Sequence, residues 1–188
     1  MSYTYFISSK KELPLGQFGV NKKVSATKTT KVTLFLEGET SIDSALKKIQ
    51  FDISNITSDE IDVYNTIEDI SGLVISKLNE YNKMVEKHFE NEYVYHIHPN
   101  FGSNFFLNHK SKIYDPLSYR GDKKTIENLF EFIKENIDKG GPMEMYTCWI
   151  GEEARNRDEK LDKVIKLSEF VLGNNFSIED RQYVRFIK

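Results

Sequence analysis

Hydrophobic and polar positions alternate in several short segments of the chain. In the first of these, Tyr3, Tyr5 and Ile7 alternate with Thr4, Phe6 and Ser8. This period of two is typical of a β-strand. Similar patterns, rich in β-branched and aromatic residues, predict strands at residues 3–8, 31–37, 93–98, 104–107, 143–150 and 180–187. Neither set of alternate positions in 143–150 is strongly polar, which predicts a central strand covered on both faces.

A spacing of three and four residues predicts two long helices. The first covers residues 67–89, with Thr66 as its cap and Asp69 three residues on, although Gly72 weakens its middle and leaves Leu78 as an alternative start. The second covers residues 123–138, with Asp122 as its cap. Residues 41–54 fit a short helix that leads into a strand. Residues 164–172 fit either a strand or a helix, and residues 12–19, which contain proline and glycine, predict a loop.

Strands therefore outnumber helices, and short turns join several of them. This favours an α+β fold, with a mostly antiparallel β-sheet and two or three packed helices in one domain, residues 1–188. We expect Trp149 to lie buried between the sheet and a helix.

Composition narrows the class of protein. The chain is 39% hydrophobic and 13% aromatic, which is too apolar for a disordered chain. Its net charge of −3 argues against general nucleic-acid binding. A single cysteine, Cys148, excludes an internal disulfide and fits a reducing compartment. No segment has the ~20 apolar residues that span a bilayer, and no signal peptide is recognisable, so we expect a cytoplasmic protein without a membrane partner.

Charge is unevenly distributed along the chain. Residues 49–76 contain six carboxylates and no basic residue. A one-signed surface attracts partners of the opposite sign, so this acidic segment predicts a docking surface for a basic protein, although a solvated surface is the alternative. The residues expected to contact the partner are Asp59, Glu60, Asp62, Tyr64, Glu68 and Asp69.

Two further groups could carry chemistry. Glu152 and Glu153 form a carboxylate pair at the end of a strand, which could serve acid/base chemistry if burial separated their pKa values, or could contact the partner. The alternative is a solvated loop that Arg155 and Arg157 neutralise.

His96 and His98 would point to one face of a strand and could begin a zinc site, with His109 or a carboxylate as the third ligand. The spacing is generic, and the alternative is that both histidines face solvent or a helix edge. We therefore expect no metal and no cofactor.

Three segments carry a resemblance to a family. They are YFISSKKELPLG at residues 5–16, the helix at 129–133 followed by EMYTCWIGEE at 144–153, and DRQYV at 180–184. Together they are similar to uncharacterised small cytoplasmic proteins of low-GC Gram-positive bacteria that resemble polymorphic-toxin immunity proteins. The resemblance implies a protein that binds and neutralises a toxin domain, and it brings no catalytic residues.

The sequence thus favours a non-enzymatic protein-binding protein that occludes the basic active cleft of a toxin domain with an acidic face. The alternative is a small metal-binding protein or metal-dependent enzyme using His96 and His98. An assembly subunit with exposed aromatic residues is a third interpretation, and the sequence leaves the oligomeric state open.

Overall fold

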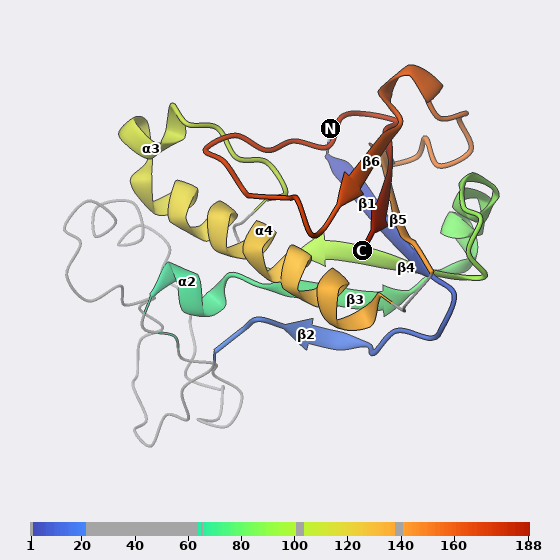
Figure 1. Ribbon diagram of the computed structural model, residues 1–188, viewed down its shortest axis with the longest axis horizontal. Coiled ribbons are helices and arrows are strands. Elements are labelled where there is room, and N and C mark those ends of the chain that lie inside the picture. The colour runs from blue at the N-terminus through green and yellow to red at the C-terminus, as the bar shows by residue number, and fades with distance from the viewer. Residues whose placement is uncertain (1, 22–63, 65, 101–103, 138–140) are drawn as a thin grey trace, which may run out of the picture.

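The computed structural model describes residues 2–21, 64, 66–100, 104–137 and 141–188, and within them it has an α+β fold. The described strands form a seven-stranded sheet in the order β2-β3-β4-β1-β5-β7-β6 (Figure 1). Neighbouring strands are antiparallel except β6 and β7, which are parallel. The predicted fold class is therefore confirmed. The strands are β1 Tyr3–Ser9, β2 Gly16–Phe18, β3 Leu73–Lys77, β4 Tyr93–Pro99, β5 Met143–Trp149, β6 Lys163–Lys166 and β7 Tyr183–Ile187.

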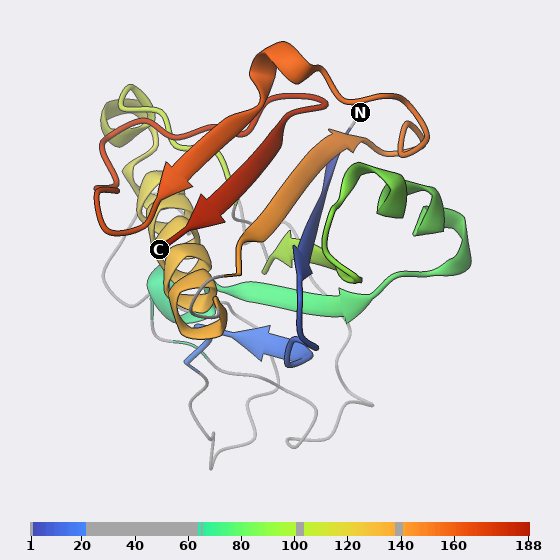
Figure 2. The ribbon, with the colours of Figure 1, turned by 45° about the vertical axis from the view of Figure 1, so that its right-hand side comes forward.

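One long helix, α4 (Pro116–Asn136), lies across one face of the sheet (Figure 2). Its buried stripe, including Ile126, Leu129 and Ile133, belongs to the main core with Ile7 and Met145 of the central strands. The short helices α2 (Ile67–Ile70) and α3 (Ser111–Tyr114) pack against α4. This side of the sheet therefore contains most of the buried apolar surface that drives folding.

The opposite face of the sheet has a smaller core. Phe6, Tyr146 and Cys148 pack there with Val85 of η2, a 3-10 helix (Glu80–His88). Strand β5 is consequently buried on both faces, as its sequence predicted. A second 3-10 helix, η3 (Glu159–Leu161), precedes β6.

The predicted continuous helix at 67–89 is wrong, whereas the alternative start near Leu78 lies close to the start of η2 at Glu80. The structure divides this segment into α2, β3 and η2, although Thr66 does cap α2 with Asp69 in a capping box. Gly72 marks the break, because a Cβ there would lie 2.3 Å from the carbonyl oxygen of Phe18. Strand pairing of β3 with β2 and β4 thus outweighs the helical spacing.

The second predicted helix exists but starts earlier. Helix α4 begins at Pro116 with Asp115 as its cap, and Asp122 lies inside it. Gly121 lies inside the helix and is buried where a Cβ would lie 3.0 Å from Ile67 and 3.1 Å from Ser71. Its missing side chain allows α2 to approach α4.

Of the remaining predicted segments, some are confirmed and others are wrong. Strands at 3–8, 93–98, 143–150 and 180–187 are confirmed, and the ambiguous segment at 164–172 begins as strand β6. The strand at 104–107 is wrong, because the segment contributes only an isolated bridge between Leu107 and Phe176. The predicted loop at 12–19 contains strand β2. The predictions for 31–37 and 41–54 lie outside the described residues. Among the described helices, none has the length and apolar character to cross a bilayer.

Candidate functional site

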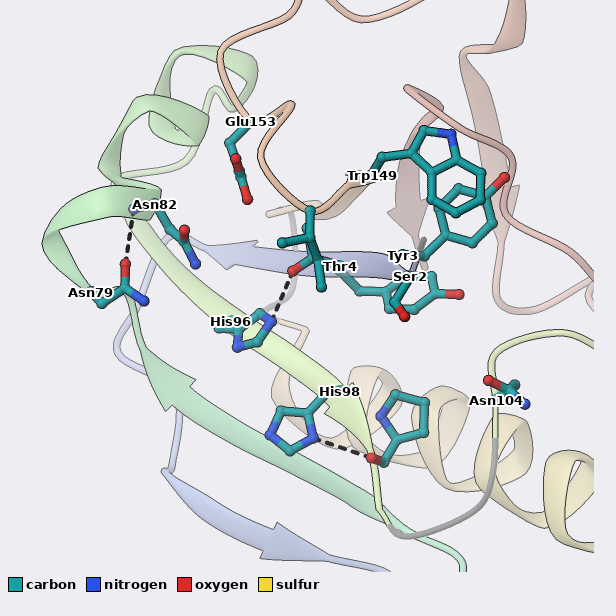
Figure 3. A pocket seen from close by; sticks show the side chains of 13 residues that line it. Ser2, Tyr3, Thr4, Asn79, Asn82, His96, His98, Asn104, Trp149 and Glu153 are labelled. Carbon is teal, nitrogen blue, oxygen red and sulfur yellow. Dashed lines mark hydrogen bonds between the residues drawn. The ribbon is translucent and has the colours of Figure 1, made fainter.

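A pocket of ≈ 670 Å³ opens at one end of the sheet (Figure 3). The start of β1 and the ends of β4 and β5 meet there, because antiparallel pairing places Tyr5 opposite Ile97 and Tyr3 opposite Trp149. Concave sites of this size that combine aromatic and polar side chains are typical binding sites. The residues that line it are Ser2, Tyr3, Thr4, Tyr5, Asn79, Asn82, His96, His98, Pro99, Asn104, Trp149, Ile150 and Glu153.

Trp149 and Tyr3 form the aromatic side of the pocket. Their rings stack with centroids 4.1 Å apart and an interplanar angle of 18°. Trp149 is only partly buried, so the expectation of a tryptophan buried between the sheet and a helix is wrong. It is the last residue of β5, where the strand leaves the region covered by α4. Partly exposed Trp and Tyr side chains are the residues most enriched at the energetic centres of protein interfaces.

The two strand histidines lie on the polar side of the pocket. His96 and His98 share the face of β4 opposite to Tyr95 and Ile97, and their ring centroids are 5.4 Å apart. Nε2 of His96 lies 2.9 Å from the Thr4 hydroxyl, and Nδ1 of His98 donates to the carbonyl of Pro99 at 3.1 Å. Burial, followed by the neighbouring His98, lowers the pKa of His96 below its usual 6.5. One ring nitrogen of each histidine therefore remains without a hydrogen bond within the described part of the chain.

The third predicted metal ligand is elsewhere. His109 is exposed in the turn before α3, where its backbone N–H donates to Asn175. His109 does not line the pocket. Across the described ranges, the structure contains no group of three or more His, Cys, Asp or Glu side chains arranged to hold a metal ion.

Glu152 and Glu153 separate after β5. Glu152 is bound through both carboxylate oxygens by Arg155, at 2.8 Å for each contact. Glu153 is 7% exposed and turns back over the pocket, with Oε1 accepting from the backbone N–H of Gly151 at 3.1 Å. Gly151 makes this turn with φ +89°, a conformation that favours glycine. The pair thus divides into one solvent-facing ion pair and one carboxylate at the pocket.

Neighbouring groups hold the loop that carries Glu153. Nε2 of His88 donates to the carbonyl of Glu153 at 3.1 Å, and its ring stacks on Tyr146. Burial lowers the pKa of His88. Lys87 donates to the carbonyl of Ala154. These contacts attach the loop to η2.

Asparagine amides form the remaining polar wall. Asn79 caps η2 by accepting from the N–H of Asn82, and both residues face the pocket. Asn104 lies on the other side, where its backbone N–H donates to Asp122 at 2.7 Å. The sequence did not identify these amides, or Tyr3 and Thr4, as site residues. Strand alternation predicts only that Thr4 shares a face of its strand with Phe6, and the pairing of β1 with β4 brings it to His96. The amides have no periodic signal.

The acidic segment does not contribute to the pocket in the described structure. Asp59, Glu60 and Asp62 lie outside the described residues, and Tyr64 is partly buried. Glu68 pairs with Arg120 at 2.9 Å, while Asp69 accepts from Thr66 in the capping box and from Asn21. Glu68 and Asp69 therefore have contacts within the chain that a partner would have to share.

Cys148 has the surroundings of an inert thiol. It is fully buried, and burial, followed by the nearby Glu153, raises its pKa to about 12. A thiol rather than a thiolate is therefore present near neutral pH, and thiols are poor nucleophiles.

Comparison of the chain with protein-family models, with curated proteins and with solved structures finds no match.

Proposed function

We propose that this protein is a non-enzymatic binding protein that neutralises a toxin domain by covering the toxin's basic active cleft. The observation that carries the proposal is the pocket at the end of the sheet, which the Tyr3–Trp149 stack and the carboxylate of Glu153 both line. Aromatic anchors at the centre of a concave site, with polar groups around them, are the usual composition of a protein-binding hot spot.

Charge supports a basic partner. Within the described residues, Glu153 is the only Asp, Glu, Lys or Arg that lines the pocket, and the whole chain has a net charge of −3. A nuclease-type cleft that holds phosphates is positively charged, and carboxylates on a rigid scaffold complement it. The acidic segment at 49–76 adds six carboxylates that would speed the encounter.

Exposed apolar side chains near the pocket support the same function. Ile150 follows Trp149 and is largely exposed, and Tyr81 and Met84 are exposed on η2, the helix that contributes Asn82. When a partner docks, the residues around an aromatic centre exclude water from it, and this strengthens the central contacts.

The test uses immobilised protein as bait in a lysate of the organism that encodes it. Wild type and Trp149→Ala are compared, with Tyr114→Ala as the matched control because Tyr114 is an aromatic residue, 84% exposed, outside the pocket. The captured partner is identified by mass spectrometry, purified and assayed for its own activity with and without this protein.

We expect wild type and Tyr114→Ala to retain one partner that has a basic toxin domain, and Trp149→Ala to lose it. About one molecule of this protein should inhibit one molecule of the toxin. Equal capture by all three baits would place the interface elsewhere. A partner that keeps its activity when bound would overturn the neutralising function.

A further inference from the structure

Several polar groups in the pocket have no hydrogen-bond partner in the described part of the chain. Oε2 of Glu153, the side chain of Asn82 and one ring nitrogen each of His96 and His98 have no hydrogen-bond partner among the residues that the structure describes. Figure 3 shows Glu153, Asn82 and His96 gathered on one side of Thr4, while Tyr3 and Trp149 lie on the other. The free oxygen of Glu153, the amide oxygen of Asn82 and Nε2 of His98, whose Nδ1 carries the proton, can each accept from a ligand with several donors.

Within the described ranges, no lysine or arginine pairs with the carboxylate of Glu153. Arg155 is bound to Glu152, Lys87 is bound to the carbonyl of Ala154, and Arg157 pairs with Asp162 at 3.4 Å. None of these three cations lines the pocket. Glu153, with 93% of its surface already removed from water, would gain a charge-assisted hydrogen bond from an incoming cation.

We infer that the pocket receives the guanidinium group of an arginine side chain from the protein partner. A guanidinium is planar, has five N–H donors and no acceptor, and stacks on aromatic rings. The Glu153 carboxylate would accept a charge-assisted hydrogen bond, and the amide oxygen of Asn82 and Nε2 of His98 would accept further N–H groups. The Tyr3–Trp149 stack would contact the arginine stem and the neighbouring backbone. This inference rests on the proposed function and names the group that the site recognises.

Two other cations fit less well. A divalent metal prefers three or four protein ligands, and the described residues supply no group of three His, Cys, Asp or Glu side chains. A lysine ammonium has three donors on one point charge and uses fewer of the acceptors that the pocket presents. The spread of acceptors from Glu153 to His98 favours the wider guanidinium.

Trp149 provides the readout, because it is the only tryptophan in the chain and lines the pocket. Its fluorescence is titrated with the capped peptide acetyl-Gly-Arg-Gly-amide. Two matched probes replace arginine with citrulline, which has the same shape without the charge, or with lysine. Zinc ion alone is the fourth probe.

We expect a saturable change with the arginine peptide and binding at least about tenfold weaker with citrulline, because a charge-assisted hydrogen bond is lost. Glu153→Gln should weaken arginine binding by a similar factor, whereas Glu152→Gln should bind as wild type does because Glu152 lies outside the pocket. Asn82→Ala is the second variant. Its side chain makes no hydrogen bond within the described structure, so it tests recognition without disturbing the Gly151 turn.

Equal binding of citrulline or lysine would overturn the assignment to a guanidinium. So would a zinc response in wild type that the double variant His96→Ala/His98→Ala lacks, because that would identify a metal site. If every peptide fails while Trp149→Ala still loses the toxin partner, the arginine assignment falls and the proposed function stands. If the arginine peptide binds but no toxin is neutralised, the arginine assignment stands and the proposed function falls.

Discussion

Tyr3 and Trp149 face each other across β1 and β5 as directly opposed residues, and their rings stack 4.1 Å apart. The contact closes the end of the two central strands and exposes one edge of the stack to the pocket. Its position explains why a large aromatic residue can occur at the end of a central strand without full burial: a neighbouring ring, rather than the helix-covered core, removes part of its surface from water.

Replacing Trp149 with alanine should therefore have a moderate effect on stability. We expect the free energy of unfolding to fall by about 1–2 kcal/mol, less than the roughly 3–5 kcal/mol typical of a fully buried tryptophan. Because the variant has no tryptophan, urea unfolding should be followed by far-UV circular dichroism. Tyr114→Ala is the control and should change stability by less than about 0.5 kcal/mol. A loss as large as that for a core residue would contradict the partial exposure of Trp149.

Glu144 should contribute far more to the stability of the fold than a surface carboxylate does. It is fully buried in β5, and its Oε2 accepts from the Ser8 hydroxyl at 2.8 Å and from the backbone N–H groups of Glu90 and Asn91. Glu144→Ala leaves these donors unpaired, so we expect a loss of about 3 kcal/mol or more in chemical denaturation. Glu152→Ala, which removes an exposed ion pair, should cost less than about 1 kcal/mol. Similar losses in the two variants would show that the buried network is not needed.

Asp122 should make stability depend on pH. Burial raises its pKa to about 6, against the opposing effect of the hydrogen bond from Asn104. An acid with a higher pKa when folded binds more protons in the folded state, so its contribution to stability falls as pH rises from about 4 to about 6. Asp122→Asn keeps an oxygen that can accept from Asn104 and removes the charge.

The variant should therefore be more stable than wild type at pH 7 and nearly equal to it at about pH 4. We expect a difference of about 1 kcal/mol, because Asp122 is only partly buried and solvent screens its charge. Urea denaturation at both pH values measures it. A difference between wild type and variant that stays constant with pH would contradict the raised pKa.

His96 should make arginine binding sensitive to acid. Its pKa is below the usual value, so the ring is uncharged near neutral pH. The groups that face it are the Thr4 hydroxyl on β1, His98 on β4 and Glu153 after β5. As pH falls through the pKa of His96, the new positive charge should repel the guanidinium and weaken binding.

The control is His96→Gln, whose amide can still bond to Thr4 and cannot become charged. Other titrating groups are the same in both proteins, so the part of the pH dependence that belongs to His96 is the difference between their profiles. Identical profiles for wild type and His96→Gln in the peptide titration would show that His96 is not near the bound cation.

The acidic segment should govern how fast the partner arrives. Reversing the charge of Asp59, Glu60 and Asp62 to lysine should slow association by about tenfold at low salt, and raising the ionic strength should reduce the difference. We expect the free energy of unfolding to change by less than about 0.5 kcal/mol. Surface plasmon resonance with the purified toxin domain measures the rates. Unchanged rates would mean that the pocket alone determines the encounter.

The sequence alone determined the strands that are either strictly alternating or buried on both faces. Strands β1, β4, β5 and β7 were predicted correctly because period-two spacing of large apolar residues is a local property of the chain. The α+β class followed from these strands and from the apolar stripe of α4. The division of 67–89 could not be predicted in this way, because pairing of β3 with two neighbouring strands decided it.

Only the tertiary structure placed the candidate site. His96, Glu153 and Asn82 come from three separate segments, and antiparallel pairing together with the turn at Gly151 brings them around one pocket. Glu152 instead contacts Arg155, and His109 lies outside the pocket, near α3. Residue types and spacing identify which groups can accept a proton or a cation, but which of them share a site depends on long-range packing, which no local pattern encodes.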